Sequence, residues 1–129
     1  MWLGLDIGER RTGIATSTSG QLATPRGTLV GSLANQITKL IEIIDQESVQ
    51  TIVVGTPRPG QPLPLHIEEF LTSLRKGLGA RPVALVFTDE TLTTKEVERR
   101  LSPRAIKKAD TDALAAQLIL EDYLAEQQS

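Results

Sequence analysis

The first residues of the chain alternate between large apolar side chains and small or polar ones, and this alternation predicts a β-strand. Positions 3, 5 and 7 are leucine or isoleucine and share one face, whereas Asp6 shares the other face with glycines at positions 4 and 8. Two further strands are expected over residues 13–19 and 22–30, after a hairpin at residues 8–11. The chain therefore opens with a predicted three-stranded meander.

The rest of the chain alternates helical patterns with short apolar strands, which is typical of an α/β protein. Unbroken apolar runs at residues 51–54 and 82–87 predict strands covered on both faces, as in a parallel sheet. Ser32 is placed as the N-cap of the first helix, and Gly77 and Gly79 are expected to end the second. Apolar spacing places the later helices over residues 65–76, 93–101 and 111–126.

The size of the chain is that of a single domain, which is expected to span residues 1–129. It has no cysteine and one histidine, which excludes disulfides, thiolate metal sites and a histidine-rich zinc site. That histidine, His66, lies just after a proline-rich loop and is interpreted as a surface residue without a role. No apolar run approaches the roughly 20 residues of a membrane helix and no leader is evident, so a soluble cytoplasmic protein is expected.

Asp6 stands within an otherwise apolar strand, and two interpretations of it are open. The neighbouring glycines leave its face of the strand bare, with room for a bulky partner. The carboxylate is either a structural group that accepts hydrogen bonds from turn amides or a metal ligand at the edge of the sheet. The metal ligand is favoured, because an ionised group so close to a core needs a cation or several donors.

Further acidic residues are expected near Asp6. Asp89 and Glu90 follow the last apolar strand, at the carboxyl end where ligands of α/β sheets collect. Asp112 lies on an apolar stripe of the last helix, and the alanines on that stripe would let the helix approach the sheet closely. Its alternative role is a favourable interaction with the helix dipole, next to Asp110 as the N-cap.

The predicted catalytic residues are Asp6, Glu90 and Asp112, and Asp89 is a further candidate metal ligand. Adjacent residues of an extended segment point to opposite faces, so only one of the pair joins Asp6 directly, and the longer side chain favours Glu90. Oxygen-only ligands select hard cations, so the expected cofactor is Mg²⁺ or Mn²⁺. Two such ions about 4 Å apart activate water and stabilise the leaving oxygen in phosphodiester hydrolysis.

Short motifs along the whole chain, none specific alone, resemble a known family through their order and spacing. In chain order they are Gly4-Leu5-Asp6-Ile7-Gly8, Arg11, Gly13-Ile14-Ala15, Ala23-Thr24-Pro25, Ile52-Val53-Val54-Gly55-x-Pro57, Asp89-Glu90-x-Leu92-Thr93-Thr94 and Asp112-x-x-Ala115-Ala116-x-x-Ile119-Leu120. This set resembles the YqgF/RuvX family, whose members are described as Holliday junction resolvases and as nucleases that mature the 5′ end of precursor small-subunit rRNA.

The resemblance implies a ribonuclease H-like fold, with five strands in a mixed sheet and helices on both faces. It also implies a metal-dependent nuclease that acts on structured RNA or branched DNA, with a homodimer left open. By this resemblance Asp6 corresponds to the first-strand metal aspartate, Asp89 and Glu90 to the middle acidic pair, and Asp112 to the last-helix aspartate. Thr91 departs from the family's usual arginine, and residues 56–60 replace a longer Asn-Met-Asp-Gly type segment; both changes bear on substrate choice and level of activity.

Two rival functions remain open at this point. An Asp-x-Gly motif on a first hairpin also marks actin-like ATP-binding phosphotransferases, although that fold needs two such domains and a much longer chain. The second rival is a nucleic-acid-binding module of the same fold without catalysis. Metal-dependent cleavage distinguishes this module from a nuclease.

Basic side chains are concentrated between two of the proposed metal ligands. The whole chain has a net charge of −2, yet residues 95–108 carry six basic and two acidic side chains. They are either phosphate contacts or a solvated helix face. The candidate nucleic-acid-binding residues, which include two in the first hairpin and one in the proline-rich loop, are Arg10, Arg11, Arg58, Lys95, Arg99, Arg100, Arg104, Lys107 and Lys108.

Replacing Arg99, Arg100 and Lys107 by alanine should weaken nucleic-acid binding to the same extent for every sequence. The slope of log affinity against log salt concentration should flatten by roughly one unit per lost phosphate contact, because each contact releases condensed counterions. Binding titrations at several salt concentrations measure this slope. An unchanged slope would assign the cluster to a solvated helix face.

Overall fold

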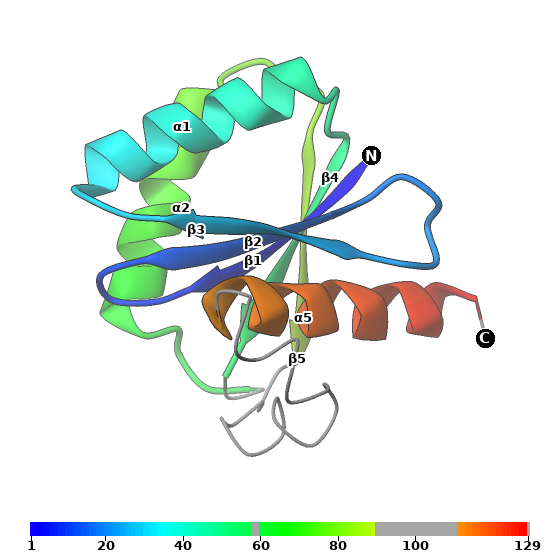
Figure 1. Cartoon of the computed structure of the whole chain (residues 1–129). Helices are drawn as coiled ribbons and strands as arrows, with labels where there is room; N and C mark the ends of the chain where they lie inside the picture. The colour runs from blue at the N-terminus through cyan, green and yellow to red at the C-terminus, as the bar shows by residue number, and fades with distance from the viewer. Residues whose placement is uncertain (58–59, 90–110, 129) are drawn as a thin grey trace.

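The computed structural model describes residues 1–57, 60–89 and 111–128, in which five strands form one mixed sheet (Figure 1). The strand order is β3-β2-β1-β4-β5; β1, β2 and β3 are antiparallel neighbours, while β4 and β5 run parallel to β1. The predicted meander followed by parallel strands is thus confirmed. The bounds are β1 Trp2–Ile7, β2 Thr12–Ser17, β3 Thr24–Leu29, β4 Thr51–Thr56 and β5 Ala84–Asp89.

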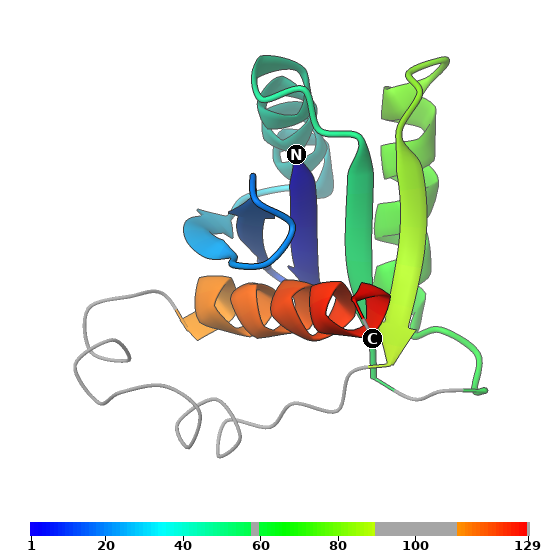
Figure 2. The same cartoon turned by 90° about the vertical axis from the view of Figure 1, so that its right-hand side faces the viewer.

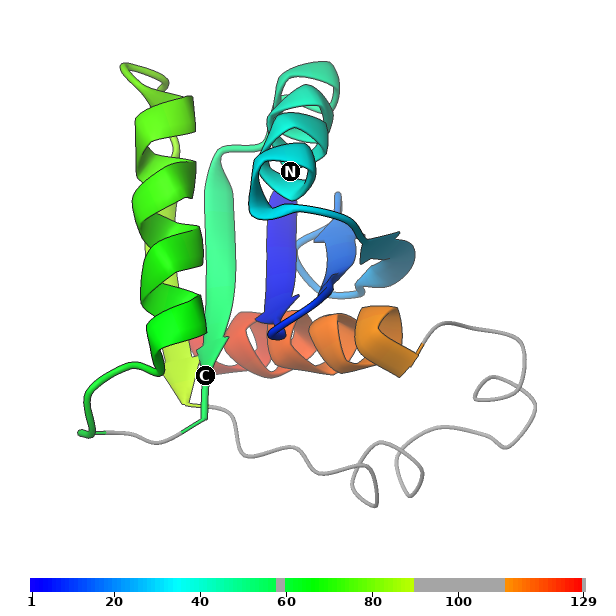
Figure 3. The ribbon, with the colours of Figure 1, turned by 90° about the vertical axis from the view of Figure 1, so that its left-hand side faces the viewer.

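Helices cover both faces of this sheet. Helices α1 (Leu33–Gln46) and α2 (Leu65–Leu78) lie on one face, and α5 (Thr111–Gln127) crosses the strands on the other, as Figures 2 and 3 show from opposite sides. The helix expected over residues 93–101 lies outside the described residues. No helix in the described part of the chain combines the length and apolar character needed to cross a bilayer.

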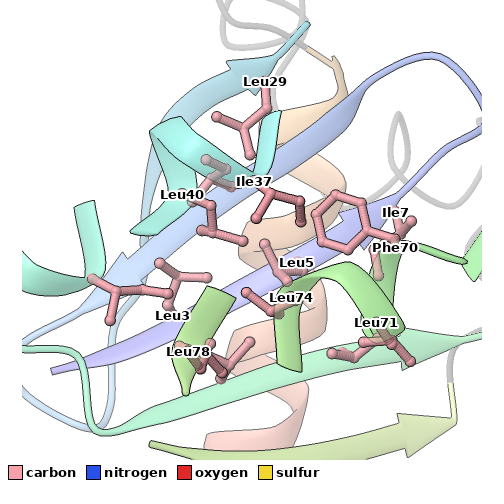
Figure 4. Packing of buried hydrophobic residues seen from close by; sticks show 14 of the residues in the cluster. Leu3, Leu5, Ile7, Leu29, Ile37, Leu40, Phe70, Leu71, Leu74 and Leu78 are labelled. Carbon is pink, nitrogen blue, oxygen red and sulfur yellow. The ribbon is translucent and has the colours of Figure 1, made fainter. Parts of the chain in front are cut away.

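The larger apolar core lies between the sheet and the α1/α2 layer. Leu3 and Leu5 of β1 point into it, where they meet Leu40 of α1 together with Phe70 and Leu74 of α2 (Figure 4). All five side chains are almost fully buried, and burial of one such side chain contributes roughly 1.5–3 kcal/mol relative to exposure. The apolar face of β1 is therefore fixed toward α1 and α2, so that Asp6, which alternates with it, faces α5.

Local signals set the start of α1 and the end of α2. The Ser32 side chain accepts a hydrogen bond from the Asn35 backbone N–H at 3.1 Å, which confirms Ser32 as the N-cap of α1. Gly79 ends α2 with a φ of 57°, but the expectation that Gly77 also ends it is wrong, since α2 continues to Leu78. A Cβ at Gly77 would lie 3.3–3.4 Å from side-chain carbons of α1, so this glycine allows two helices to pack closely.

Helix α5 approaches the sheet so closely that two strand positions have no room for a side chain. A Cβ at Gly4 of β1 would lie 2.9 Å from the backbone oxygen of Ala116, and a Cβ at Gly13 of β2 would lie 1.9 Å from that of Asp112. Ala116 itself is fully buried. The small residues on both partners therefore set the distance between α5 and the sheet, as the alanines on the helical stripe predicted.

Gly13→Ala should lower the free energy of unfolding by more than the roughly 1–3 kcal/mol of ordinary overpacking, because its Cβ would meet backbone that cannot move aside. Gly77→Ala is the matched control, since its Cβ meets only flexible side chains and alanine favours a helix interior by about 1 kcal/mol over glycine. Chemical denaturation of both variants measures the difference. Equal stabilities would show that α5 can shift away from β2.

Candidate active site

On its face of the sheet, Asp6 has glycine at three neighbouring positions, and we call the place without side chains around Asp6 the glycine gap; α5 covers it over Gly4 and Gly13. Gly4 precedes it by two residues on the same face, and Gly13 lies directly opposite it on β2. The parallel register that pairs Leu5 with Val54 brings Gly55 of β4 beside it on the other flank. A cavity of about 280 Å³ opens at this point, and its lining includes Asp6, Gly55, His66 and Ala115. The Asp6 carboxylate is therefore half-buried but reachable from solvent.

The same glycine gap brings Asp112 close to Asp6. Gly13 is the cross-strand neighbour of Asp6, and the backbone of Asp112, in the first turn of α5, rests directly on Gly13. The Asp112 side chain also forms an ion pair with Arg11, whose Nε lies 2.8 Å from Oδ2. The structure thus brings together two of the three predicted catalytic carboxylates, and a predicted nucleic-acid contact, Arg11, holds one of them.

The electrostatics of Asp6 reflect this crowding. Burial, and secondly the negative charge of Asp112, raise the pKa of Asp6 to about 6. Among the described residues, the hairpin amide of Gly8 donates to the carbonyl of Arg11 at 3.0 Å and not to Asp6. The interpretation of Asp6 as an acceptor of turn amides therefore has no support in the hairpin. Two close carboxylates that are partly shielded from water favour a bound cation, which would neutralise both charges.

The donor chemistry of this gap fits a hard divalent cation. Asp6 and Asp112 offer carboxylate oxygens, and oxygen donors without thiolate suit Mg²⁺ or Mn²⁺. The third predicted ligand, Glu90, lies outside the described residues. Within residues 1–57, 60–89 and 111–128 no group of three or more His, Cys, Asp or Glu side chains is placed to hold a metal.

Asp89 is not brought to Asp6. It is the last residue of β5 and is exposed. Along β5, Val86 packs in the cluster beneath α5, whereas Leu85 packs toward the α1/α2 layer, and alternation puts Asp89 on the face of Leu85. Asp89 therefore points to the face opposite Asp6, and its role as a ligand stays a prediction.

Of the predicted basic contacts, only Arg10 and Arg11 lie within the described residues. Arg10 is exposed in the β1–β2 hairpin, where its carbonyl accepts a hydrogen bond from Gln36 Nε2 at 3.1 Å. The Arg11 side chain is 65% exposed despite its ion pair, so much of the guanidinium stays in solvent. Those outside the described residues are Arg58, Lys95, Arg99, Arg100, Arg104, Lys107 and Lys108.

His66 belongs to this region, although no role for it is expected from the sequence. It lies in the first turn of α2, is half-buried and lines the same cavity as Asp6. The structure thus places His66 at a cavity beside Asp6, a position that its interpretation as a plain surface residue did not include. One sequence signal could have indicated it: the loop before α2 leaves the carboxyl end of β4, next to β1, where ligands of such sheets collect.

Comparison with known proteins agrees with this geometry. Residues 1–126 match the family model described as RuvX: Holliday junction resolvase. The chain belongs to the RuvX family. Similar relatives from Desulforudis audaxviator and Thermus thermophilus are 39% and 35% identical to it, and each alignment covers at least 92% of both chains. Both relatives are named "Putative pre-16S rRNA nuclease". The RuvX chain is accordingly a nuclease, a hydrolase of phosphodiester bonds.

Solved structures of resolvases share the fold of this RuvX chain. Thermus thermophilus RuvC superposes with a TM-score of 0.63 at 14% identity, covering 98% of this chain and 96% of RuvC. The fowlpox virus resolvase, solved with Holliday junction DNA, gives a TM-score of 0.65 at 8% identity and covers 99% of both chains. At such low identity the likeness shows the fold, and it confirms the predicted ribonuclease H-like architecture.

Asp6→Asn should stabilise the metal-free protein at pH 8 and have little effect below pH 4. The folded state raises the Asp6 pKa from 3.8 to about 6. As pH rises through this window, ionisation of Asp6 therefore lowers the free energy of unfolding of the wild type, by up to about 3 kcal/mol. Denaturation with EDTA across this pH range measures the effect. Asp45→Asn is the control of opposite sign, because Arg81 lowers the Asp45 pKa. Equal pH profiles for wild type and Asp6→Asn would contradict this account.

Proposed function

We propose that this RuvX protein is a divalent-metal-dependent nuclease whose natural substrate is precursor 16S rRNA. The observation that supports the metal dependence is the proximity of Asp112 to the half-buried Asp6, since burial and the Asp112 charge together raise the Asp6 pKa to about 6. The substrate rests on the relatives, since those at 35–39% identity carry the rRNA name, while the DNA-bound resolvase is only 8% identical. An rRNA precursor also implies a cytoplasmic location.

In this proposal, two carboxylates bind the metal and an arginine positions one of them. Asp6 and Asp112 would hold Mg²⁺ or Mn²⁺, with Glu90 as the proposed third ligand. When bound, the metal supplies a nucleophilic water at neutral pH and stabilises charge on the phosphate oxygens. Asp6 offers a carboxylate with no amide donors from its hairpin, and Arg11 orients the Asp112 carboxylate through the 2.8 Å ion pair.

The exposed guanidinium of Arg11 has a second use next to these carboxylates. Its Nε is engaged by Asp112, but the side chain is 65% exposed, so its remaining N–H groups can donate to a phosphate. A phosphate oxygen placed between the cation and Arg11 would be neutralised from two sides. Arg11 would thereby link the bound strand to the position of Asp112, and the cluster at residues 95–108 would add further phosphate contacts.

Asp6→Asn should abolish metal-dependent cleavage without unfolding the protein, since the amide keeps the size of the side chain and removes its charge. The loss should exceed the roughly 10- to 100-fold typical of changes to groups that only support a metal ligand. The assay offers precursor rRNA, single-stranded RNA and a four-way DNA junction with Mg²⁺, Mn²⁺ or EDTA. Full activity in a folded Asp6→Asn protein would contradict the proposal. Absence of cleavage by the wild type with every metal would also contradict it, and if the wild type still binds nucleic acid, that result would identify a non-catalytic binding module.

The acidic pair after β5 provides a matched comparison in the same assay. Glu90→Gln should lose metal affinity and turnover in a Mn²⁺ titration, whereas Asp89→Asn should keep both, because Asp89 lies on the face away from Asp6. The reverse result would make Asp89 the ligand.

A further inference from the structure

A groove adjoins the Asp6 cavity and is not used by the proposed chemistry. Its volume is about 820 Å³, within the range of roughly 300–1,000 Å³ typical of small-molecule sites. Pro57 and His66 line both this groove and the Asp6 cavity, so the two hollows meet at these side chains. The groove therefore continues directly from the carboxylates.

The walls of the groove are chemically divided. One wall is apolar and comes from the loop between β4 and α2 and the start of α2; its members are Pro57, Pro62, Leu63, Pro64 and Leu65. The polar lining groups are Gln61 and His66 together with two carboxylates, Glu9 from the first hairpin and Glu69 from α2. Leu65 is 69% exposed, so part of the apolar wall faces solvent.

His66 occupies the junction of the hollows in this region. Besides the two already described, it lines a third of about 100 Å³, which it shares with Glu9, Glu69 and Gly8. His66 is half-buried, although Leu65, the residue before it in the first turn of α2, is exposed. The imidazole of His66 is a flat ring that lines the groove together with Glu9, Glu69 and the apolar wall. Such a ring is suited to stacking against another flat group.

We infer that this groove holds one unpaired nucleobase of the substrate strand, from a nucleotide next to the cleaved phosphodiester bond, stacked against His66 and the proline wall. The inference rests on the proposed function, because the groove gains its meaning from its junction with the Asp6 gap. It adds a recognition site to the catalytic one and predicts that the strand is unpaired where it is cut.

Charge decides between a base and the sugar-phosphate backbone as the occupant. Glu9 and Glu69 both line the groove, and their negative charges disfavour a phosphate group beside them. A base is uncharged, and its exocyclic amino groups donate hydrogen bonds to carboxylates, as cytosine N4 does to Glu or Asp. The backbone of the strand would instead follow Arg11 at the edge of the gap.

The inference can be tested by combining base deletions in the RNA with substitutions of His66 in the protein. Single-stranded RNA oligonucleotides spanning the mapped cleavage site are made with one base deleted at each position in turn, and their affinities are measured in the cleavage-deficient Asp6→Asn background with Mg²⁺. One deletion beside the cleaved bond should weaken binding about 5- to 150-fold, the range for loss of a stacked base. In a protein that also carries His66→Ala, the same base deletion should weaken binding much less, because the stacking partner is already absent. With His66→Phe the deletion should weaken binding as before, because phenylalanine keeps a flat ring.

Glu68→Ala is the matched control, because Glu68 lies in the same turn of α2 but does not line the groove, and it should leave the pattern unchanged. Thermal melts confirm that each variant is folded. If wild type cleaves RNA but His66→Ala weakens all oligonucleotides equally, or not at all, the groove proposal is overturned while the nuclease stands. If wild type cleaves none of the substrates with any metal, the proposed function itself fails.

Discussion

The contact between α5 and the first hairpin is the constraint on which the rest of the site depends. The backbone of Asp112 rests on Gly13, and the backbone of Ala116 rests on Gly4, at distances that leave no space for a Cβ. Because Asp6 lies on the same face as Gly4 and directly opposite Gly13, the contact that packs the helix also fixes the separation of two carboxylates. Packing and chemistry are thus set by the same few small residues.

This arrangement works against the stability of the metal-free fold. Close packing of α5 desolvates Asp6 and brings another negative charge toward it, so the ionised form is disfavoured and its pKa rises to about 6. The ion pair of Arg11 with Asp112 relieves only part of this repulsion, because the arginine is mostly exposed and solvent screens it. Strain of this kind is expected where function needs charge that folding alone would not select.

The sequence predicted those features that depend on local pattern. Alternation in β1 put Asp6 opposite the core-facing leucines, and Ser32 and Gly79 act as helix caps, because each signal lies within a few residues of its effect. Gly77 was misread because its reason is contact with another helix, which no local pattern reveals. The position of His66 at the Asp6 cavity depends on where the loop after β4 returns to the sheet, and the partner of Arg11 depends on α5, about 100 residues away in sequence. Such long-range placements require the fold.

Charge is divided between the two parts of the candidate site, and this division bears on which nucleic acid fits. A duplex presents phosphates on all sides, so the acidic Glu9 and Glu69 beside the Asp6 gap would disfavour its close approach on that side. A single strand can turn its bases toward the acids and its phosphates toward Arg11, because the bases of an unpaired strand can be splayed away from its backbone. Under the function proposed above, the same ribonuclease H-like scaffold would act on branched DNA in one protein and on an unpaired RNA segment in another, through differences in the charge and shape of the loops around the carboxylates.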